Sequence, residues 1–288
     1  MAISNQSRLI LRIVIDAICY SLAILPIIIL RSRPSPYRRG FFCNDQSIMY
    51  PYKETTVSTG MLTGGCFGMV ILAVVVIELI VFFKFTRKIA SPPSPPLCCC
   101  KLNGLFLGIY RYFGIFIFGA AVCMAVTFIF KNVTGRMRPH FFDVCKPNWS
   151  VFNCSGFVDD YNCTGKEVDK ILEARLSFPS GHASLAVYTA TYVMLYMQAR
   201  LQWENVVMIL KHLIQSVVMF LGIYVAVTRV VDNMHHWSDV LAGSLLGFGI
   251  ASVMVFAISD LYHKPLAKSH EQQLADHWNE ATKSNDIV

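Results

Sequence analysis

The fold of this chain is limited most strongly by six long apolar runs that polar segments separate. They cover about residues 9–30, 61–83, 112–130, 183–199, 210–227 and 240–261. A helix needs roughly 20 mostly apolar residues to cross the hydrocarbon core of a bilayer, and shorter runs suffice for a helix buried among others. Only 15% of the residues are charged, whereas soluble domains carry about 25%. We therefore expect an all-α, polytopic membrane domain of six helices over residues 1–263, followed by a polar cytoplasmic tail over 264–288.

An even number of crossings places both ends of the chain on one face of the membrane and loops 31–60, 131–182 and 228–239 on the other. The Lys and Arg residues divide almost equally between these faces, so the positive-inside rule does not choose an orientation. The loops contain four glycosylation acceptor patterns: at Asn153, less favourably at Asn148 and Asn162, and at Asn132, which lies too close to the membrane for us to expect a sugar there. The loops are thus predicted to face the exterior or a lumen, in the plasma membrane first and the endoplasmic reticulum as the alternative.

The cysteines support the same orientation. Four of them lie in the outer loops: Cys43, Cys145, Cys154 and Cys163. We expect at least one disulfide among these four in an oxidising compartment, with the pairing left open by the sequence. On the opposite, cytosolic face, Cys98, Cys99 and Cys100 follow a proline-rich stretch. That juxtamembrane position makes them candidates for S-palmitoylation.

Three short segments of the outer loops concentrate cationic and imidazole side chains. They are residues 131–139, 177–182 and 228–239, and each lies at the outer end of a predicted span. Lys131, Arg138 and Arg229 supply cationic donors suited to a phosphoryl group. Ser180 and Gly181 directly precede a predicted helix, whose free N–H groups and positive dipole end favour an anion. The topology therefore predicts a phosphate-binding site at the outer membrane surface.

The same segments contain candidates for acid, base and nucleophilic chemistry. His235 and Asp239 are four residues apart, so the carboxylate can orient one ring nitrogen and leave the other as a nucleophile. His182 is then the expected proton donor. A zinc site formed by His182, His235, His236 and Asp239 is the alternative. We favour the site without a metal or other cofactor, because the neighbouring cations would repel zinc.

Other polar groups have simpler expected roles. Arg136 and Arg38 are interpreted as headgroup anchors, because basic residues at span ends usually bind lipid phosphates. Asp16 and Glu78 lie within apolar runs and are expected to pair with other helices. The glycine patterns at 64–68 and 243–247 permit close helix approach, either within the chain or in a homo-oligomer.

The three polar segments resemble the signature motifs of the type 2 phosphatidic acid phosphatase superfamily, K-x6-R-P, P-S-G-H and S-R-x5-H-x3-D. Lys131, Arg138 and Pro139 match the first motif, residues 179–182 the second, and Arg229, His235 and Asp239 the third. Thr228 replaces the motif's serine and keeps a hydroxyl. The surrounding sequence is most similar to the integral-membrane lipid phosphate phosphatases.

The resemblance implies a six-helix enzyme that removes phosphate from phosphatidate, lysophosphatidate, ceramide 1-phosphate and sphingosine 1-phosphate. It implies that His235 forms a phosphohistidine, that Asp239 orients it and that His182 protonates the leaving alkoxide. Three other interpretations are a non-catalytic relative, a phosphatase for a soluble ester such as a sugar phosphate, and a transporter. Complete motifs disfavour the non-catalytic relative, and collinearity with six-span lipid enzymes disfavours the phosphatase for a soluble ester. The lack of an internal repeat disfavours the transporter. Nucleic acid is excluded as a partner, because the basic residues are few and lie between apolar runs.

Overall fold

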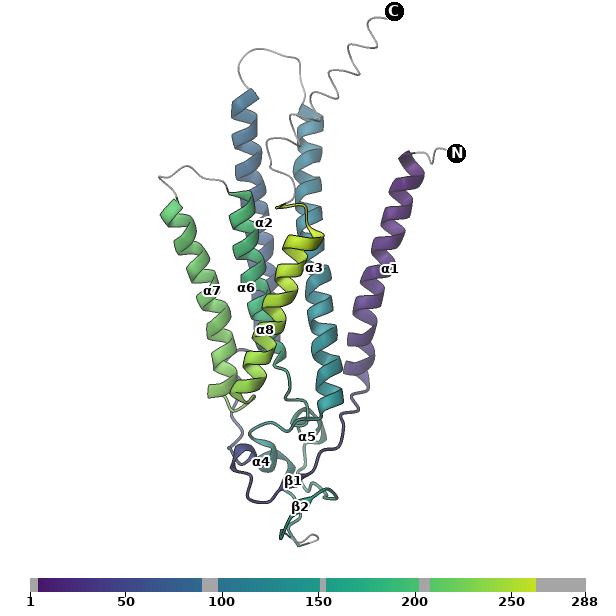
Figure 1. Cartoon of the computed structure of the whole chain (residues 1–288), viewed down its shortest axis with the longest axis vertical. Helices are drawn as coiled ribbons and strands as arrows, with labels where there is room; N and C mark the ends of the chain where they lie inside the picture. The colour runs from purple at the N-terminus through teal and green to yellow at the C-terminus, as the bar shows by residue number, and fades with distance from the viewer. Residues whose placement is uncertain (1–4, 90–97, 151–153, 202–207, 263–288) are drawn as a thin grey trace, which may run out of the picture.

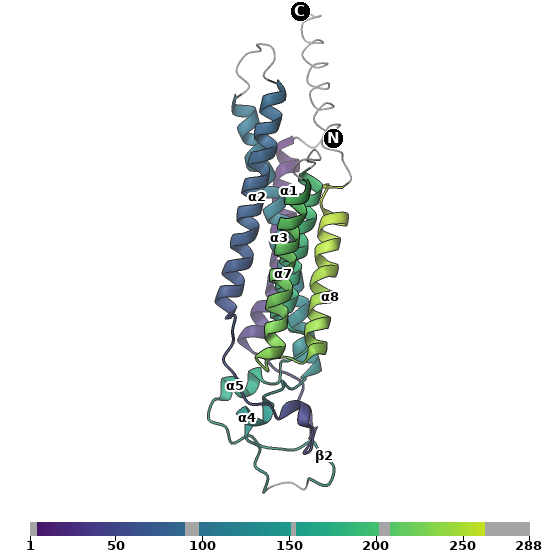
Figure 2. The same ribbon diagram turned by 90° about the vertical axis from the view of Figure 1, so that its left-hand side faces the viewer.

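The computed structural model describes residues 5–89, 98–150, 154–201 and 208–262. Long helices form a bundle, and a small outer region caps one end of it (Figures 1 and 2). The bundle consists of α1 (Asn5–Ser32), α2 (Thr59–Ile89), α3 (Cys98–Thr134), α6 (Gly181–Arg200), α7 (Met208–Val231) and α8 (Trp237–Val253), which continues into the π-helical η3 (Met254–Ile258). The outer region contains β1 (Phe41–Phe42), η1 (Gln46–Ile48), α4 (Phe141–Cys145), β2 (Phe157–Val158) and α5 (Val168–Glu173).

Each predicted apolar run corresponds to a helix of the bundle. Among the described residues, five helices are long and apolar enough to cross a membrane, namely α1, α2, α3, α7 and α8 with η3. Helix α6 is not one of the five. It packs against α2, α3, α7 and α8, and its buried Ser184, Thr189 and Thr191 lower its hydropathy. Polar side chains are tolerated there because neighbouring helices, rather than lipid, surround them.

Three tyrosines on one face of α6 fix this helix to its neighbours. Tyr188, Tyr192 and Tyr196 follow the four-residue repeat of a helix face, and all three are buried. Their hydroxyls donate to the carbonyl oxygens of Phe116 and Tyr112 and to the carboxylate of Glu78, at 2.8, 2.6 and 2.7 Å respectively. A buried hydroxyl without a partner would be costly. These bonds therefore hold α6 in register with α2 and α3.

Glu78 confirms the expectation that its carboxylate pairs with another helix. It accepts from the guanidinium of Arg200, with a 2.8 Å bond from Nε, and both side chains are nearly buried. Asp16, by contrast, is exposed on α1. Among the described residues it forms no ion pair with another helix, so the predicted pairing of Asp16 is not seen.

Helix α8 packs closely on α6 through two glycines. A Cβ atom at Gly243 would lie 2.4 Å from the carbonyl oxygen of Ser180, and one at Gly247 would lie 2.2 Å from that of Ser184. Neither position can accept a side chain without separating the helices. The 243–247 pattern therefore serves packing within the chain. At Gly64 and Gly68 a Cβ would meet no atom within 4 Å.

Two disulfides link the outer region, which confirms the prediction of at least one. They join Cys43 to Cys154 and Cys145 to Cys163. This region lies at the end of the bundle opposite to the start of α1 and the end of η3 (Figure 1). Of the acceptor asparagines, Asn148 and Asn162 are exposed, whereas Asn153 lies outside the described residues. The tail 264–288 and the side chains of Cys98, Cys99 and Cys100 also lie outside the description.

Candidate active site

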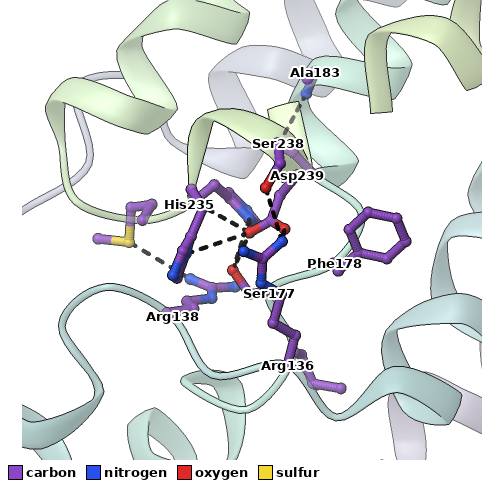
Figure 3. Close-up of polar contacts among 12 residues, drawn as sticks. Arg136, Arg138, Ser177, Phe178, Ala183, His235, Ser238 and Asp239 are labelled. Atoms are coloured by element: carbon purple, nitrogen blue, oxygen red, sulfur yellow. Dashed lines mark hydrogen bonds and ion pairs between the residues drawn. The ribbon is translucent and has the colours of Figure 1, made fainter. Parts of the chain in front are cut away.

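The three predicted segments meet at the outer end of the bundle, between α3, α6, α7 and α8. Main-chain hydrogen bonds join them: Ser180 N–H donates to the carbonyl of Asp239 at 3.0 Å, and Ser177 N–H donates to that of Arg136 at 3.0 Å. Figure 3 shows Arg136, Arg138, Ser177, His235 and Asp239 directed toward one another. Residues more than a hundred positions apart thus form one cluster.

Asp239 lies at the centre of this cluster and is fully buried. Its Oδ1 accepts from the Arg136 guanidinium at 2.6 Å, and its Oδ2 accepts from the Ser177 hydroxyl at 2.6 Å and from His236 N–H at 3.1 Å (Figure 3). The His236 bond belongs to the cap of α8, of which Asp239 is the third residue. A buried carboxylate is stable when it is paired in this way.

His235 contacts this carboxylate through a serine rather than directly. Its Nδ1 lies 3.9 Å from Asp239 Oδ2, which exceeds hydrogen-bond length, and 3.4 Å from Ser177 Oγ. The Ser177 hydroxyl proton is directed to Asp239, so its oxygen is free to accept from Nδ1–H. This arrangement favours the tautomer with the proton on Nδ1 and leaves Nε2 with a lone pair.

The surroundings of His235 favour its neutral form. The imidazole is buried, and burial lowers its pKa well below the usual value, with the charges of Lys131 and Arg138 acting in the same direction and Asp239 opposing them. A neutral imidazole is the form that a nucleophile requires. The site therefore holds an unprotonated, oriented ring nitrogen beside several cations.

The three predicted cations surround His182. Burial, together with the charges of Arg229, Arg138 and Lys131, lowers the pKa of His182 to about 4. Among the described residues, Nε2 of His182 and Nε of Arg138 are buried without a hydrogen-bond partner. Buried polar groups are normally satisfied, so Arg138 Nε–H, and His182 Nε2 once it is protonated, can donate to an anion.

Each cation is also held by the protein. Arg138 donates to Glu173 Oε1 at 3.0 Å and Arg229 to Asp232 Oδ2 at 2.9 Å, while Lys131 Nζ donates to the carbonyl oxygen of Leu176. These contacts fix the cations before a ligand binds. Such preorganisation favours stabilisation of charge that develops during a reaction.

Ser180 and Gly181 lie where the sequence predicted, at the start of α6. Ser180 is the N-cap, and its Oγ accepts from Ala183 N–H at 3.4 Å. A Cβ at Gly181 would lie 3.9 Å from Cε of Lys131. The N-terminus of α6, which is the positive end of the helix dipole, thus lies beside Lys131.

Two contributors were missed or misread from the sequence. Arg136 was expected to anchor lipid headgroups, but it forms an ion pair with Asp239 and donates to Ser238 Oγ at 2.9 Å. Ser177 was noted without a role. The sequence contains one weak indication that Arg136 belongs to the site: it lies two residues before Arg138 in the same short segment. The expectation for Arg136 is therefore corrected.

The zinc alternative gains no support from the geometry. Among the residues that the structure describes, no group of three or more His, Cys, Asp or Glu side chains is arranged to hold a metal ion. His236 instead caps α8, and its Nδ1 lies 3.9 Å from Asp239 Oδ2. The chemistry of the described site is that of an anion-binding cluster with two imidazoles.

A helical bundle that carries this cluster at its outer end defines a class of membrane phosphatase, and residues 112–262 match the model of the PAP2 superfamily. The chain belongs to this superfamily. It is 40% identical to phospholipid phosphatase 2 of Rattus norvegicus over 252 residues, which cover 87% of each chain. Phospholipid phosphatase 1 of Rattus norvegicus is also 40% identical, over 87% of this chain and 86% of its own.

A human relative agrees with these two. Phospholipid phosphatase 2 of Homo sapiens is 38% identical over 87% of this chain and 83% of its own. No solved structure gives a significant match. Family membership and these relatives identify the protein as a phosphatase, that is, a hydrolase of phosphate esters.

Proposed function

We propose that this protein hydrolyses lipid phosphate monoesters to the dephosphorylated lipid and inorganic phosphate, without a metal or other cofactor. The substrates are phosphatidate, lysophosphatidate, ceramide 1-phosphate and sphingosine 1-phosphate, which it meets among the membrane lipids. The observation that carries this proposal is a buried, neutral His235 beside three fixed cations at the end of an apolar bundle. A site at the membrane surface suits a substrate whose phosphate is polar and whose chains are apolar.

The first half of the reaction transfers the phosphoryl group to His235. Nε2 attacks phosphorus, the bond between phosphorus and the lipid oxygen breaks, and the leaving alkoxide takes a proton from His182. Lys131, Arg138, Arg229 and the N–H groups at Ser180 and Gly181 neutralise the phosphoryl oxygens. Asp239, through Ser177, stabilises the positive charge that His235 gains.

The second half releases phosphate. His182, now neutral, accepts a proton from water, which attacks phosphorus and breaks its bond to Nε2 of His235. Burial and the neighbouring cations lower the pKa of His182 to about 4. This supports a protonation that depends on substrate. A bound phosphate dianion offsets the charges that act with burial to keep His182 neutral, so the imidazole gains its proton together with the substrate.

We also propose that α6 is the sixth span, that residues 1–263 form one membrane domain and that 264–288 form a cytoplasmic tail. The site then faces the exterior of the plasma membrane, or a lumen, and both ends of the chain face the cytosol. The support is that both disulfides lie at the same end of the bundle as the site. Glycosylation at Asn153 belongs to the same orientation.

The test is phosphate release from purified protein in detergent, supplied with the four lipid phosphates and with a soluble sugar phosphate. His235→Ala should abolish release and prevent formation of a radiolabelled phosphoenzyme. His212→Ala is the matched control, because His212 is exposed on α7. Activity on the sugar phosphate alone, or a phosphoenzyme that persists in His235→Ala, would refute the proposal. EDTA should leave the activity unchanged.

A further inference from the structure

An unassigned segment, residues 50–57, lies across all three motif-bearing segments just before α2. We call it the strap. Tyr50 N–H donates to the carbonyl of Pro139 at 3.0 Å, and Asn233 Nδ2 donates to the carbonyl of Pro51 at 3.0 Å. The main chain of Val57 lies close enough to His182 to raise the pKa of its imidazole. The strap lies outside the residues 112–262 that match the superfamily model, yet it contacts residues of each motif segment.

The strongest of these contacts is with a buried carboxylate. Thr56 donates twice to Asp232, from its N–H to Oδ2 at 2.8 Å and from its hydroxyl to Oδ1 at 2.7 Å. The Asp232 side chain is only 7% exposed and also accepts from Arg229. Thr56 thus satisfies the carboxylate that holds the most buried cation of the site.

Asp232 presents a problem that the strap resolves. A carboxylate beside a phosphate site repels the substrate unless other donors satisfy its charge. Two donors from Thr56 and one from Arg229 do so. Asp232 accepts from NH2 of Arg229, and the Thr228 hydroxyl accepts from NH2 and Nε. Among the described residues, NH1 is the guanidinium nitrogen left to donate to phosphate.

We propose, on the basis of the phosphatase function above, that Thr56 and Asp232 are positioning residues that orient Arg229 for the substrate phosphate. The strap then lines the active site, in addition to connecting the preceding segment to α2. Its effect on the reaction passes through Arg229, so it should change phosphate binding and transition-state stabilisation for every substrate that carries the same phosphoryl group.

The test compares three threonine variants in purified protein. Thr56→Val removes the hydroxyl and should lower kcat/KM about tenfold, with a parallel weakening of vanadate inhibition, because a hydrogen bond to a charged group has been lost. Thr56→Ser keeps the hydroxyl and should stay within about twofold of wild type. Thr63→Val is the matched control, since Thr63 is exposed on α2 and its hydroxyl donates to the carbonyl of Thr59 in the same helix, at 2.8 Å.

A comparison of two substrates distinguishes an effect through Arg229 from an effect through His182. The loss in Thr56→Val should be equal for an alkyl phosphate and for an aryl phosphate whose leaving group needs no proton. A loss confined to the alkyl ester would overturn the assignment to Arg229, because it would place the effect on His182. Unchanged kcat/KM and vanadate inhibition in Thr56→Val would also overturn it. A wild-type protein inactive on both esters would instead refute the proposed function.

Discussion

Replacement of Arg136 by glutamine tests whether Asp239 depends on its ion pair. The two side chains approach to 2.6 Å, and Asp239 is completely buried while Arg136 is 31% exposed. Removal of one partner from a buried pair costs about 3–5 kcal/mol, because it leaves an uncompensated charge. Water can reach part of the Arg136 position, so we expect about 2–3 kcal/mol here.

This loss should appear in catalysis. Without the guanidinium, the Asp239 carboxylate is held less firmly where it accepts from the Ser177 hydroxyl. The Ser177 oxygen in turn accepts from His235. If the transition state loses the same stabilisation, about 2–3 kcal/mol, kcat/KM decreases about 30- to 150-fold. The decrease should fall mainly on kcat, because in the proposed mechanism Arg136 orients the nucleophile and does not bind the phosphate. Arg136→Lys should give an intermediate value, since an ammonium keeps the charge but not the fork of donors.

Arg38→Gln is the matched control, because both arginines are interpreted from the sequence as headgroup anchors. Arg38 pairs with Asp160 at 3.1 Å, but the two side chains are 49% and 97% exposed. An exposed pair contributes about 0–1 kcal/mol, so activity should stay near wild type. The assay is kcat and KM for a lipid phosphate in detergent, with thermal unfolding to verify folding. Equal kcat/KM in well-folded Arg136→Gln and Arg38→Gln would refute the reasoning.

Three further outcomes are expected. Burial keeps the pKa of His235 below its usual value, so the proposed nucleophile stays neutral as the pH falls. For an aryl phosphate, kcat/KM should therefore decline only below about pH 6.5. A midpoint of the pH profile above that value would contradict this. Arg200→Gln leaves the buried Glu78 carboxylate without its cation and should cost about 3–5 kcal/mol of stability, measured as a lower Tm in detergent. Arg111→Gln should change Tm little, because its pair with Asp260 is partly exposed. Intact cells should hydrolyse added lysophosphatidate, and hydrolysis only after permeabilisation would reverse the proposed orientation.

The helices and the polar cluster could be predicted because their signals are local. Each apolar run corresponds to a helix, since length and hydropathy alone determine what can be buried in lipid. The helix ends were less accurate: α3 begins at Cys98, well before the predicted start at 112. Residues 98–111 include polar and charged residues, and a helix satisfies its own backbone whether or not lipid surrounds it.

The partners of the site residues could not be predicted, because they depend on how the loops fold. Arg136 differs from Arg38 in the sequence only by its place two residues before Arg138. That place does not reveal that Arg136, unlike Arg38, reaches a buried carboxylate. The strap carries no motif, because several of its contacts use main-chain N–H and C=O groups. Any residue type supplies those groups, so they leave no mark in the sequence.

The close packing of α8 on α6 has a consequence for assembly. Gly243 and Gly247 occupy successive turns of α8 after Asp239, and the missing methyl groups let Ser180 N–H reach the Asp239 carbonyl. A helix face already covered over two turns cannot also receive a second copy of the chain, so a homo-oligomer would have to form through other faces. Every group of the proposed site comes from a single chain. Specific activity per chain should therefore be independent of protein concentration, because one protomer carries the complete catalytic unit.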